Sequence, residues 1–221
     1  MALNLGQQIT TPAQPNLGSP GASYDERFQS QSFGSLNTYF SKLTALFAAL
    51  FGPRGGKWIN SPYGAFQDGT DQTAANTTTA YAITFDTTDF SNGVTLSNSS
   101  RLNASQAGIY NIQFSIQFTN STNASQDVDV WFRKNGTNID KSNSRFGFAP
   151  RKGVGDPFHI VAALNFFTSL AANDYVEIMW RPTDVGVQIE HYAASSSPTR
   201  PVVPSVIATL TFVSNLSTET A

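Results

Sequence analysis

Residues 108–119 read Gly-Ile-Tyr-Asn-Ile-Gln-Phe-Ser-Ile-Gln-Phe-Thr, with a large apolar side chain at every second position from Tyr110 to Phe118. Successive side chains of a β-strand point to opposite faces of its sheet. The positions in between are Asn, Gln and Ser, which are polar but uncharged. The stretch therefore predicts a strand with one buried face and one polar face.

The same alternation recurs along most of the chain. Apolar residues alternate with polar ones, or form short runs, at 81–85, 128–132, 160–167, 175–180, 185–192 and 205–213. Asn92-Gly93 and Asn135-Gly136 are the strongest turn signals in this region. About eight strands or more, with no helical pattern between them, predict an all-β fold, either a sandwich or a jelly roll.

The composition excludes several classes of function. Charged side chains make up 13% of the 221 residues, and the formal net charge is −2. Nucleic-acid binding requires clustered cations, and a membrane span requires ~20 consecutive apolar residues. Neither feature is present in the sequence, and Met1–Thr10 has no basic or apolar region typical of a signal peptide. We therefore expect no nucleic-acid partner, no membrane partner and no secretion. The chain has no Cys, which excludes disulfides and thiolate sites.

Residues 1–34 differ in composition, because they are low in apolar residues and interrupted by Pro and Gly. Such a segment cannot bury enough surface to offset the entropy lost on its own ordering. We expect an extended N-terminal arm that is held by a neighbouring protein; the alternative is an arm that lies on its own domain. The candidate anchoring residues are its large apolar ones: Leu3, Leu5, Leu17, Tyr24, Phe28 and Phe33.

One short helix is expected after the arm, from Ser35 to Phe51. Ser35 would cap its N-terminus and Gly52-Pro53 would end it, so that residues 35–65 form an anchoring helix and a connector. A helix of this length is marginal alone. It therefore needs three-fold self-association, which we favour, or a groove on its own domain. Its apolar residues have the alternating spacing of a coiled-coil seam: Leu36, Phe40, Leu43, Phe47 and Leu50.

Three landmarks resemble the superfamily of complement globular heads and tumour-necrosis-factor-like domains. Leu102 followed by Gly108–Phe114 is similar to the aromatic motif of that superfamily, with Leu102 and Ile112 in place of two aromatic residues. Residues 131–136 resemble its strand that ends in Arg-Lys-Asn-Gly. Residues 170–176 are similar to its Leu-x-x-Gly-Asp-x-Val element, with Asn173 in place of Gly.

The resemblance implies a fold and an oligomeric state. The fold is an all-β, jelly-roll β-sandwich of about ten antiparallel strands over residues 66–221. The assembly is a compact homotrimer, in whose interface we place Tyr110 and Phe114 in addition to the helix seam.

Three further tracts are similar to the version of this domain in tailed-phage virion proteins: 62–66, the Asn- and Thr-rich 71–81, and 198–201. This implies a non-enzymatic structural protein of a bacteriophage virion, assembled in the cytoplasm of the bacterial host. The favoured role is a head decoration or cement protein, anchored through its arm to another virion protein such as the major capsid protein. The alternative is the receptor-binding tip of a short tail fibre or spike, which would recognise host surface glycans.

The sequence contains few residues in patterns typical of a catalytic or metal-binding site. The two histidines, His159 and His191, have no His or Cys partner at the spacing of metal ligands. We expect no catalytic residue, no metal and no cofactor. Asp127 and Asp129 share one face of a predicted strand and could together bind Ca²⁺. Arg133 lies on the same face and could neutralise them instead, and a solvated face is the favoured interpretation.

One loop is a candidate for ligand binding, because sugars stack on aromatic faces and hydrogen-bond to polar side chains. This candidate ligand loop spans 145–158. The competing and favoured hypothesis is that its aromatic residues cap the sandwich or pack against a neighbouring subunit. The residues concerned are Phe146, Phe148, Arg151 and Phe158.

Overall fold

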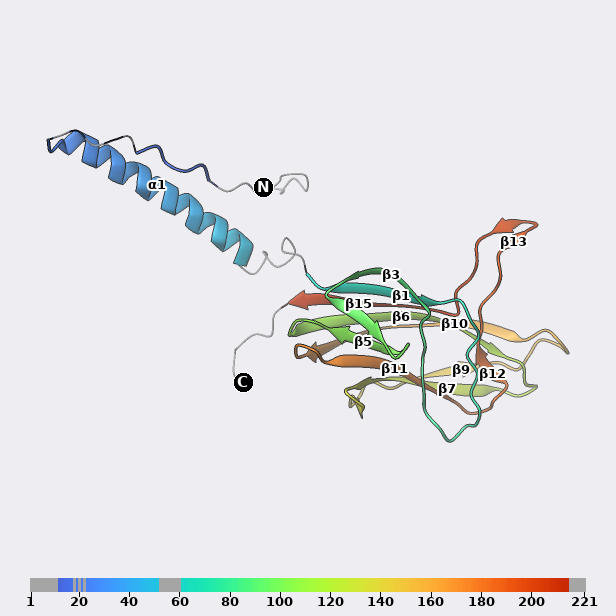
Figure 1. Ribbon diagram of the computed structural model, residues 1–221. Helices are drawn as coiled ribbons and strands as arrows, with labels where there is room; N and C mark the ends of the chain where they lie inside the picture. The colour runs from blue at the N-terminus through green and yellow to red at the C-terminus, as the bar shows by residue number, and fades with distance from the viewer. Residues whose placement is uncertain (1–11, 18, 20, 22, 52–60, 215–221) are drawn as a thin grey trace. The chain divides into compact units, whose positions relative to one another are not determined.

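The computed structural model describes residues 12–17, 19, 21, 23–51 and 61–214 (Figure 1). The chain divides into two compact units, residues 1–60 and residues 61–221. The first unit contains the helix α1, Glu26–Phe51, and the second contains all the β-strands of the described chain. No helix in the described ranges is long and apolar enough to span a membrane.

Helix α1 begins at Glu26, well before the predicted start at Ser35. The reason is a cap at Asp25, whose Oδ1 accepts hydrogen bonds from the backbone N–H groups of Arg27 (2.9 Å) and Phe28 (3.2 Å). A side-chain oxygen that satisfies these free N–H groups stabilises a helix start by about 1 kcal/mol. Phe28 and Phe33, which the sequence placed in an extended arm, are therefore helical.

Part of the N-terminal arm lies beside α1 (Figure 1). Residues 12–17 and the helix together enclose a groove of about 800 Å³, lined by Pro12, Pro15, Leu17, Phe28 and Tyr39 among others. This segment of the arm thus contacts the helix of its own chain. Leu3 and Leu5, the first two candidate anchoring residues, lie outside the described residues.

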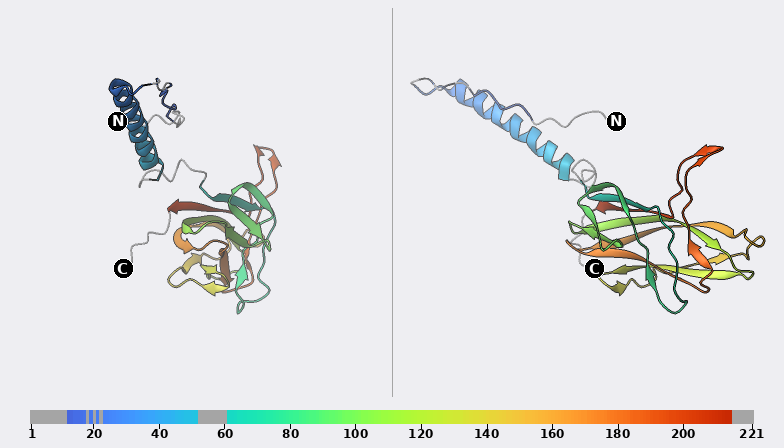
Figure 2. Two further views of the ribbon diagram at one scale, coloured as in Figure 1. Left: turned by 60° about the vertical axis from the view of Figure 1, so that its left-hand side comes forward. Right: turned by 45° about the vertical axis from the view of Figure 1, so that its right-hand side comes forward.

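The second unit is a sandwich of two antiparallel sheets (Figures 1 and 2). We call them sheet A, with strand order β10-β6-β15-β1-β3 and β12 beside β6, and sheet B, with strand order β4-β5-β11-β7-β8, β2 beside β11 and β9 beside β7. The all-β sandwich predicted from the sequence is confirmed. Sheet A consists of β1 (Tyr63–Asp68), β3 (Thr87–Asn92), β6 (Gly108–Asn120), β10 (Phe158–Leu170), β12 (Val187–Ile189) and β15 (Val206–Ser214).

Sheet B contains the remaining long strands, and a small hairpin of β13 (Ser195–Ser196) and β14 (Thr199–Arg200) projects from the sandwich (Figure 2). The bounds in sheet B are β2 (Tyr81–Ala82), β4 (Val94–Ser97), β5 (Arg101–Ala104), β7 (Gln126–Lys134), β8 (Thr137–Asn138), β9 (Ser144–Phe148) and β11 (Tyr175–Pro182).

Strand β6 contains the alternating stretch from which the fold was predicted. It pairs with β10 along its whole length on one side, and with β15 and then β12 on the other. Its alternate apolar side chains from Tyr110 to Phe118 point into the sandwich and are at most 4% exposed. Rings cross from this strand to sheet B, where Phe114 lies 5.9 Å from Phe132 and Phe118 lies 5.8 Å from Trp180, measured between centroids. Strand β10 forms the edge of sheet A.

The two Asn-Gly pairs adopt different structures. Asn135 and Gly136 both have positive φ (48° and 81°) and join β7 to β8 in a two-residue turn, as predicted. At Asn92-Gly93 there is no hairpin, because Gly93 (φ 65°) joins β3 to β4, and these strands belong to different sheets. The positive φ at this position thus moves the chain from sheet A to sheet B.

Gly108 allows the beginning of strand β6 to pack closely against β15. A Cβ at this position would lie 2.8 Å from the carbonyl oxygen of Ser214 and 2.9 Å from Cδ2 of Phe212. The ring of Phe212 in turn packs edge-on against Tyr110, with centroids 5.6 Å apart. A side chain here cannot be accommodated without moving a packed ring.

We therefore predict that Gly108→Ala lowers the free energy of unfolding by about 1–3 kcal/mol, the usual cost of overpacking. Urea denaturation monitored by circular dichroism measures this. Gly153→Ala is the matched control, because a Cβ there would meet nothing within 4 Å. Equal stability of the two variants would contradict the packing described for Gly108.

The second unit should fold without the first. Among the described residues, every member of its hydrophobic core lies between Phe66 and Leu210, within the second unit itself. We predict that a fragment of residues 61–221 unfolds cooperatively and retains the near-ultraviolet circular dichroism of the full chain. A fragment without a cooperative transition would show that the helical unit is part of the core.

Candidate functional site

The outward side of sheet A has an unusual composition. On its three long strands, β6, β10 and β15, no outward position is Asp, Glu, Lys or Arg. We call this surface the uncharged face. Its residues are Ile109, Asn111, Gln113, Ser115, Gln117 and Thr119 on β6, His159, Val161, Ala163, Asn165, Phe167 and Ser169 on β10, and Ile207, Thr209 and Thr211 on β15.

Strand register arranges these side chains in rows across the uncharged face. Ser115 pairs with Ala163 on β10 and with Ile207 on β15, so that small residues lie near the middle of the face. Large apolar side chains lie toward its margins, with Val161 52%, Phe167 54% and Ile207 43% exposed. Depletion of charge combined with exposed apolar side chains is typical of the central part of a protein interface.

The outward side of sheet B is the opposite in character. It carries acidic and basic side chains on neighbouring strands: Arg101, Asp127, Asp129, Arg133, Arg145, Glu177 and Arg181. The charges of the sandwich are thus concentrated on one of its two outer surfaces. Because charged groups strongly favour water, sheet B has the surface expected of a solvated face and sheet A does not.

Tyr110 and Phe114 do not lie on the uncharged face. Their side chains are 0% and 4% exposed and belong to the core of their own chain, so neither is available for a contact between subunits. The placement of these two residues in a trimer interface was wrong. Their neighbours Asn111, Gln113 and Ser115 occupy the outward positions instead.

The helix seam is exposed where the structure describes it. Phe40 and Phe47 are 56% and 48% exposed, and Phe33, seven residues before Phe40, is 67% exposed. Leu36 and Leu43 are half-buried, while the side chain of Leu50 lies outside the described residues. The seam thus extends one heptad toward the N-terminus, because the helix starts earlier than predicted. Three-fold association through it stays a prediction.

Asp129 is an ion-paired residue and not a solvated one. It is 7% exposed, and its carboxylate accepts hydrogen bonds from Arg145 (Nε to Oδ1, 2.9 Å) and Arg181 (Nη2 to Oδ2, 3.1 Å). The hydrogen bond from Arg145 is the main cause that lowers the pKa of Asp129, against the opposing effect of burial. Arg133, the neutralising residue suggested by the sequence, donates to Asn138 instead (Nε to Oδ1, 3.4 Å).

Neither the acidic residues nor the histidines form an evident metal site. Across the described ranges, no three His, Asp or Glu side chains gather in a group that could hold a metal ion. For Asp129, the two guanidinium groups occupy the oxygen atoms that Ca²⁺ would need.

The three aromatic residues of the candidate ligand loop lie in the strands at its two ends. Residues 144–148 form β9, and Phe158 begins β10. Phe148 is a core residue, and Phe146 and Phe158 pack against the core, as the competing hypothesis proposed. Arg151 donates from its backbone N–H to the carbonyl of Thr122 (2.8 Å) and so fastens the loop. The loop therefore does not present an aromatic platform to a ligand.

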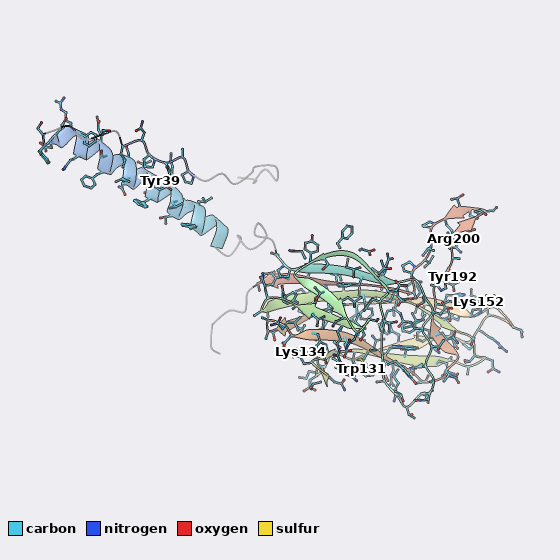
Figure 3. The ribbon with its side chains drawn as sticks, viewed as in Figure 1. Tyr39, Trp131, Lys134, Lys152, Tyr192 and Arg200 are labelled. Atoms are coloured by element: carbon cyan, nitrogen blue, oxygen red, sulfur yellow. The ribbon has the colours of Figure 1, made fainter. Side chains whose placement is uncertain are left out.

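Both histidines belong to polar contacts at one end of the uncharged face, where Figure 3 labels Tyr192. The Tyr192 hydroxyl donates to Glu190 (Oε2, 2.7 Å) and lies 2.9 Å from His159 Nδ1. Burial, together with the bond to Glu190, raises the pKa of Tyr192. Separately, His191 Nδ1 lies 2.7 Å from Asp71 Oδ1.

Asp71 titrates below its usual range because of this contact. Its partial burial alone would raise the pKa, but hydrogen bonds from the backbone N–H and the ring of His191 lower it. No local sequence pattern indicates these contacts, because positions 71, 159 and 190–192 are brought together only by strand pairing.

The comparisons with known proteins do not supply a family. No protein-family model matches the chain. No curated protein has a significantly similar sequence.

The ion pairs of Asp129 predict a pH dependence. Its pKa in the folded protein lies below the ordinary value of 3.8, so its contribution to stability is present above that value and is lost as pH falls through the lowered pKa. Asp129→Asn should lower the free energy of unfolding by about 1.5–3 kcal/mol at pH 7, the range for hydrogen bonds to charged groups. The difference from the unchanged protein should shrink below pH 3.8.

Urea denaturation at a series of pH values measures this difference. Asp156→Asn is the control, because its pair with Lys152 (3.9 Å) is more than half exposed on both sides and should contribute little. A destabilisation by Asp129→Asn that stays constant down to pH 2.5 would contradict the role of the charge.

Proposed function

We propose that the chain is a non-enzymatic structural protein that assembles as a homotrimer, and that the uncharged face of sheet A is the surface that assembles. The absence of charge from this face is the observation that carries the proposal. A monomer in water has no need to keep Lys, Glu, Asp and Arg off the outward side of three neighbouring strands of one sheet while placing them on the outward side of the other sheet.

The strand order supports a jelly roll. The chain crosses repeatedly between the sheets: it passes from β5 in sheet B to β6 in sheet A and back to β7 and β9 in sheet B, then to β10 in sheet A and back to β11 in sheet B. Such repeated crossing between two facing sheets is the arrangement of double-sheet jelly rolls. It is also the fold that the resemblance to tumour-necrosis-factor-like domains implies.

Two of the landmarks of that resemblance meet in space. Asn135, from the Arg-Lys-Asn-Gly turn, donates through Nδ2 to Asp174 Oδ1 (2.7 Å) and accepts from the backbone N–H of Tyr175 (3.0 Å). Asn173, which replaces a Gly of the family pattern, has a φ of 70°. Asn is the residue that tolerates this left-handed conformation best after Gly. The substitution is therefore compatible with the same local backbone.

The helical unit would reinforce the trimer. Once three sandwiches associate, three copies of the α1 seam are held at a high effective concentration. In that arrangement the heptad-spaced residues Phe33, Phe40 and Phe47 would face the same helix of another copy.

The proposed location is a phage virion, for which the support is the similarity of three sequence tracts to phage structural proteins. In the favoured role the protein decorates or cements the head, and its N-terminal unit contacts the major capsid protein. The tail-tip role would use the same trimer at a different place on the particle. Quantitative mass spectrometry of particles distinguishes the two, since hundreds of copies indicate the head and one or two dozen indicate the tail.

The assembly surface is tested by placing charge on it. Gln113 and Thr209 are paired neighbours on β6 and β15, in the middle of the uncharged face. We predict that the full chain sediments at three times its 23.8 kDa mass at micromolar concentration. The double variant Gln113→Glu, Thr209→Glu should dissociate into folded monomers, because burying two carboxylates at an interface costs several kcal/mol.

The matched control is Thr95→Glu, an exposed position of β4 on the other sheet, which should remain trimeric. If the unchanged protein sediments as a monomer, the proposed trimer is wrong. A trimeric double variant would show that the chains associate through another surface.

A further inference from the structure

The charged side of the sandwich contains a pocket that has no part in the proposed assembly. Its volume is about 360 Å³, at the lower end of the range for small-molecule sites. The pocket lies on the outward side of sheet B, where Figure 3 labels Trp131. Besides Asp129, the residues that matter for its chemistry are Trp131, Asn138, Asp140, Lys141, Asn143 and Arg181.

The walls of this pocket are fixed by hydrogen bonds. The Trp131 indole donates through Nε1 to Asn138 Oδ1 (2.9 Å), which sets the orientation of the ring. The turn after β8 is held by Ser142, whose buried hydroxyl donates to the carbonyl of Ile139 (2.7 Å) and accepts from the backbone N–H of Phe132 (3.1 Å). A ligand would thus meet a preformed surface, and little ordering entropy would oppose its binding.

The turn also contains a residue in a costly backbone conformation. Lys141 has a φ of 60°, in the left-handed region that residues with a long side chain seldom adopt. Such conformations cost of order 1 kcal/mol or more and tend to occur at binding sites. Lys141 itself lines the pocket, so this backbone conformation occurs at the pocket.

The charges that line the pocket cancel. Asp129 and Asp140 contribute two negative charges, and Lys141 and Arg181 contribute two positive ones. Asp129 is already ion-paired with Arg181 and Arg145. No excess of positive charge is left to attract a phosphate or a nucleotide, so the lining favours a neutral ligand.

The lining also offers donors and acceptors side by side. The amides of Asn138 and Asn143 and the guanidinium of Arg181 donate, while the carboxylate of Asp140 and the amide oxygens accept. A ligand with many hydroxyl groups uses both kinds of partner, because each hydroxyl donates once and accepts twice. The indole of Trp131 adds an apolar surface against which the C–H groups of a flat ring can pack.

We propose that this pocket binds a neutral saccharide, with one sugar ring against the indole of Trp131 and its hydroxyls hydrogen-bonded to Asn138, Asp140 and Asn143. The site lies entirely on sheet B of one chain. It therefore requires neither the trimer nor a particular place on a virion, and it can fail or succeed independently of both.

Saturation-transfer NMR on the full chain tests the proposal. The probes are glucose, galactose, mannose, rhamnose, N-acetylglucosamine, N-acetylgalactosamine and the disaccharides lactose, maltose and cellobiose. At least one probe should bind with a millimolar or lower Kd. Trp131→Ala should weaken that binding ten-fold or more, because it removes the apolar surface. Asp140→Ala should weaken it about three-fold or more, because it removes a hydrogen-bond acceptor.

Phe90→Ala is the matched control, since it removes an aromatic ring that is 69% exposed on the other sheet and should change the Kd less than two-fold. Asp140 is exposed, so its variant decides the question if Trp131→Ala fails to fold. The double variant Gln113→Glu, Thr209→Glu should bind as the unchanged protein does. Three results would overturn the proposal: no transfer to any probe, transfer that both pocket variants leave unchanged, or binding of glucuronic acid but of no neutral sugar.

Discussion

The pairing of β6 on both of its edges is the constraint on which the rest of the molecule depends. With β10 on one side and β15 on the other, the register of this strand determines which side chains enter the core. A slip of one residue would exchange Tyr110 and Phe114 for Asn111 and Ser115 on the buried side. The same register aligns Ser115 with Ala163 and Ile207 outside. One set of backbone hydrogen bonds therefore defines both the core and the uncharged face.

The sequence was sufficient to predict the sandwich, because a period of two survives in every long strand. The start of the helix was less predictable. Asp25 and Ser35 are both good capping residues, and the sequence pattern alone does not distinguish between them. A glycine inside a helix costs only about 1 kcal/mol. The cap at Asp25 contributes a stabilisation of similar size, and the helix runs through Gly34.

Side-chain contacts between strands that are distant in sequence could not be predicted from local patterns. Arg133 is four residues from Asp129 and shares its strand face, yet Arg145 and Arg181 are the partners, since β9 and β11 flank β7 at that level. The aromatic motif predicted an important strand correctly but not the direction of its side chains. Tyr110 and Phe114 fill the core because the alternate positions of β6 are mostly polar and face outward. The large apolar side chains of the strand therefore all face inward from Tyr110 to Phe118.

The position of strand β10 has a consequence for the behaviour of the single chain. Thirteen residues long, it lies at the border of sheet A, and among the described strands only β6 pairs with it. Such borders are usually guarded by Lys or Pro, and β10 contains neither. A newly made chain thus displays an open template for further strands beside exposed Val161 and Phe167. Rapid burial of this region, or a low steady-state concentration of single chains, would prevent such molecules from aggregating.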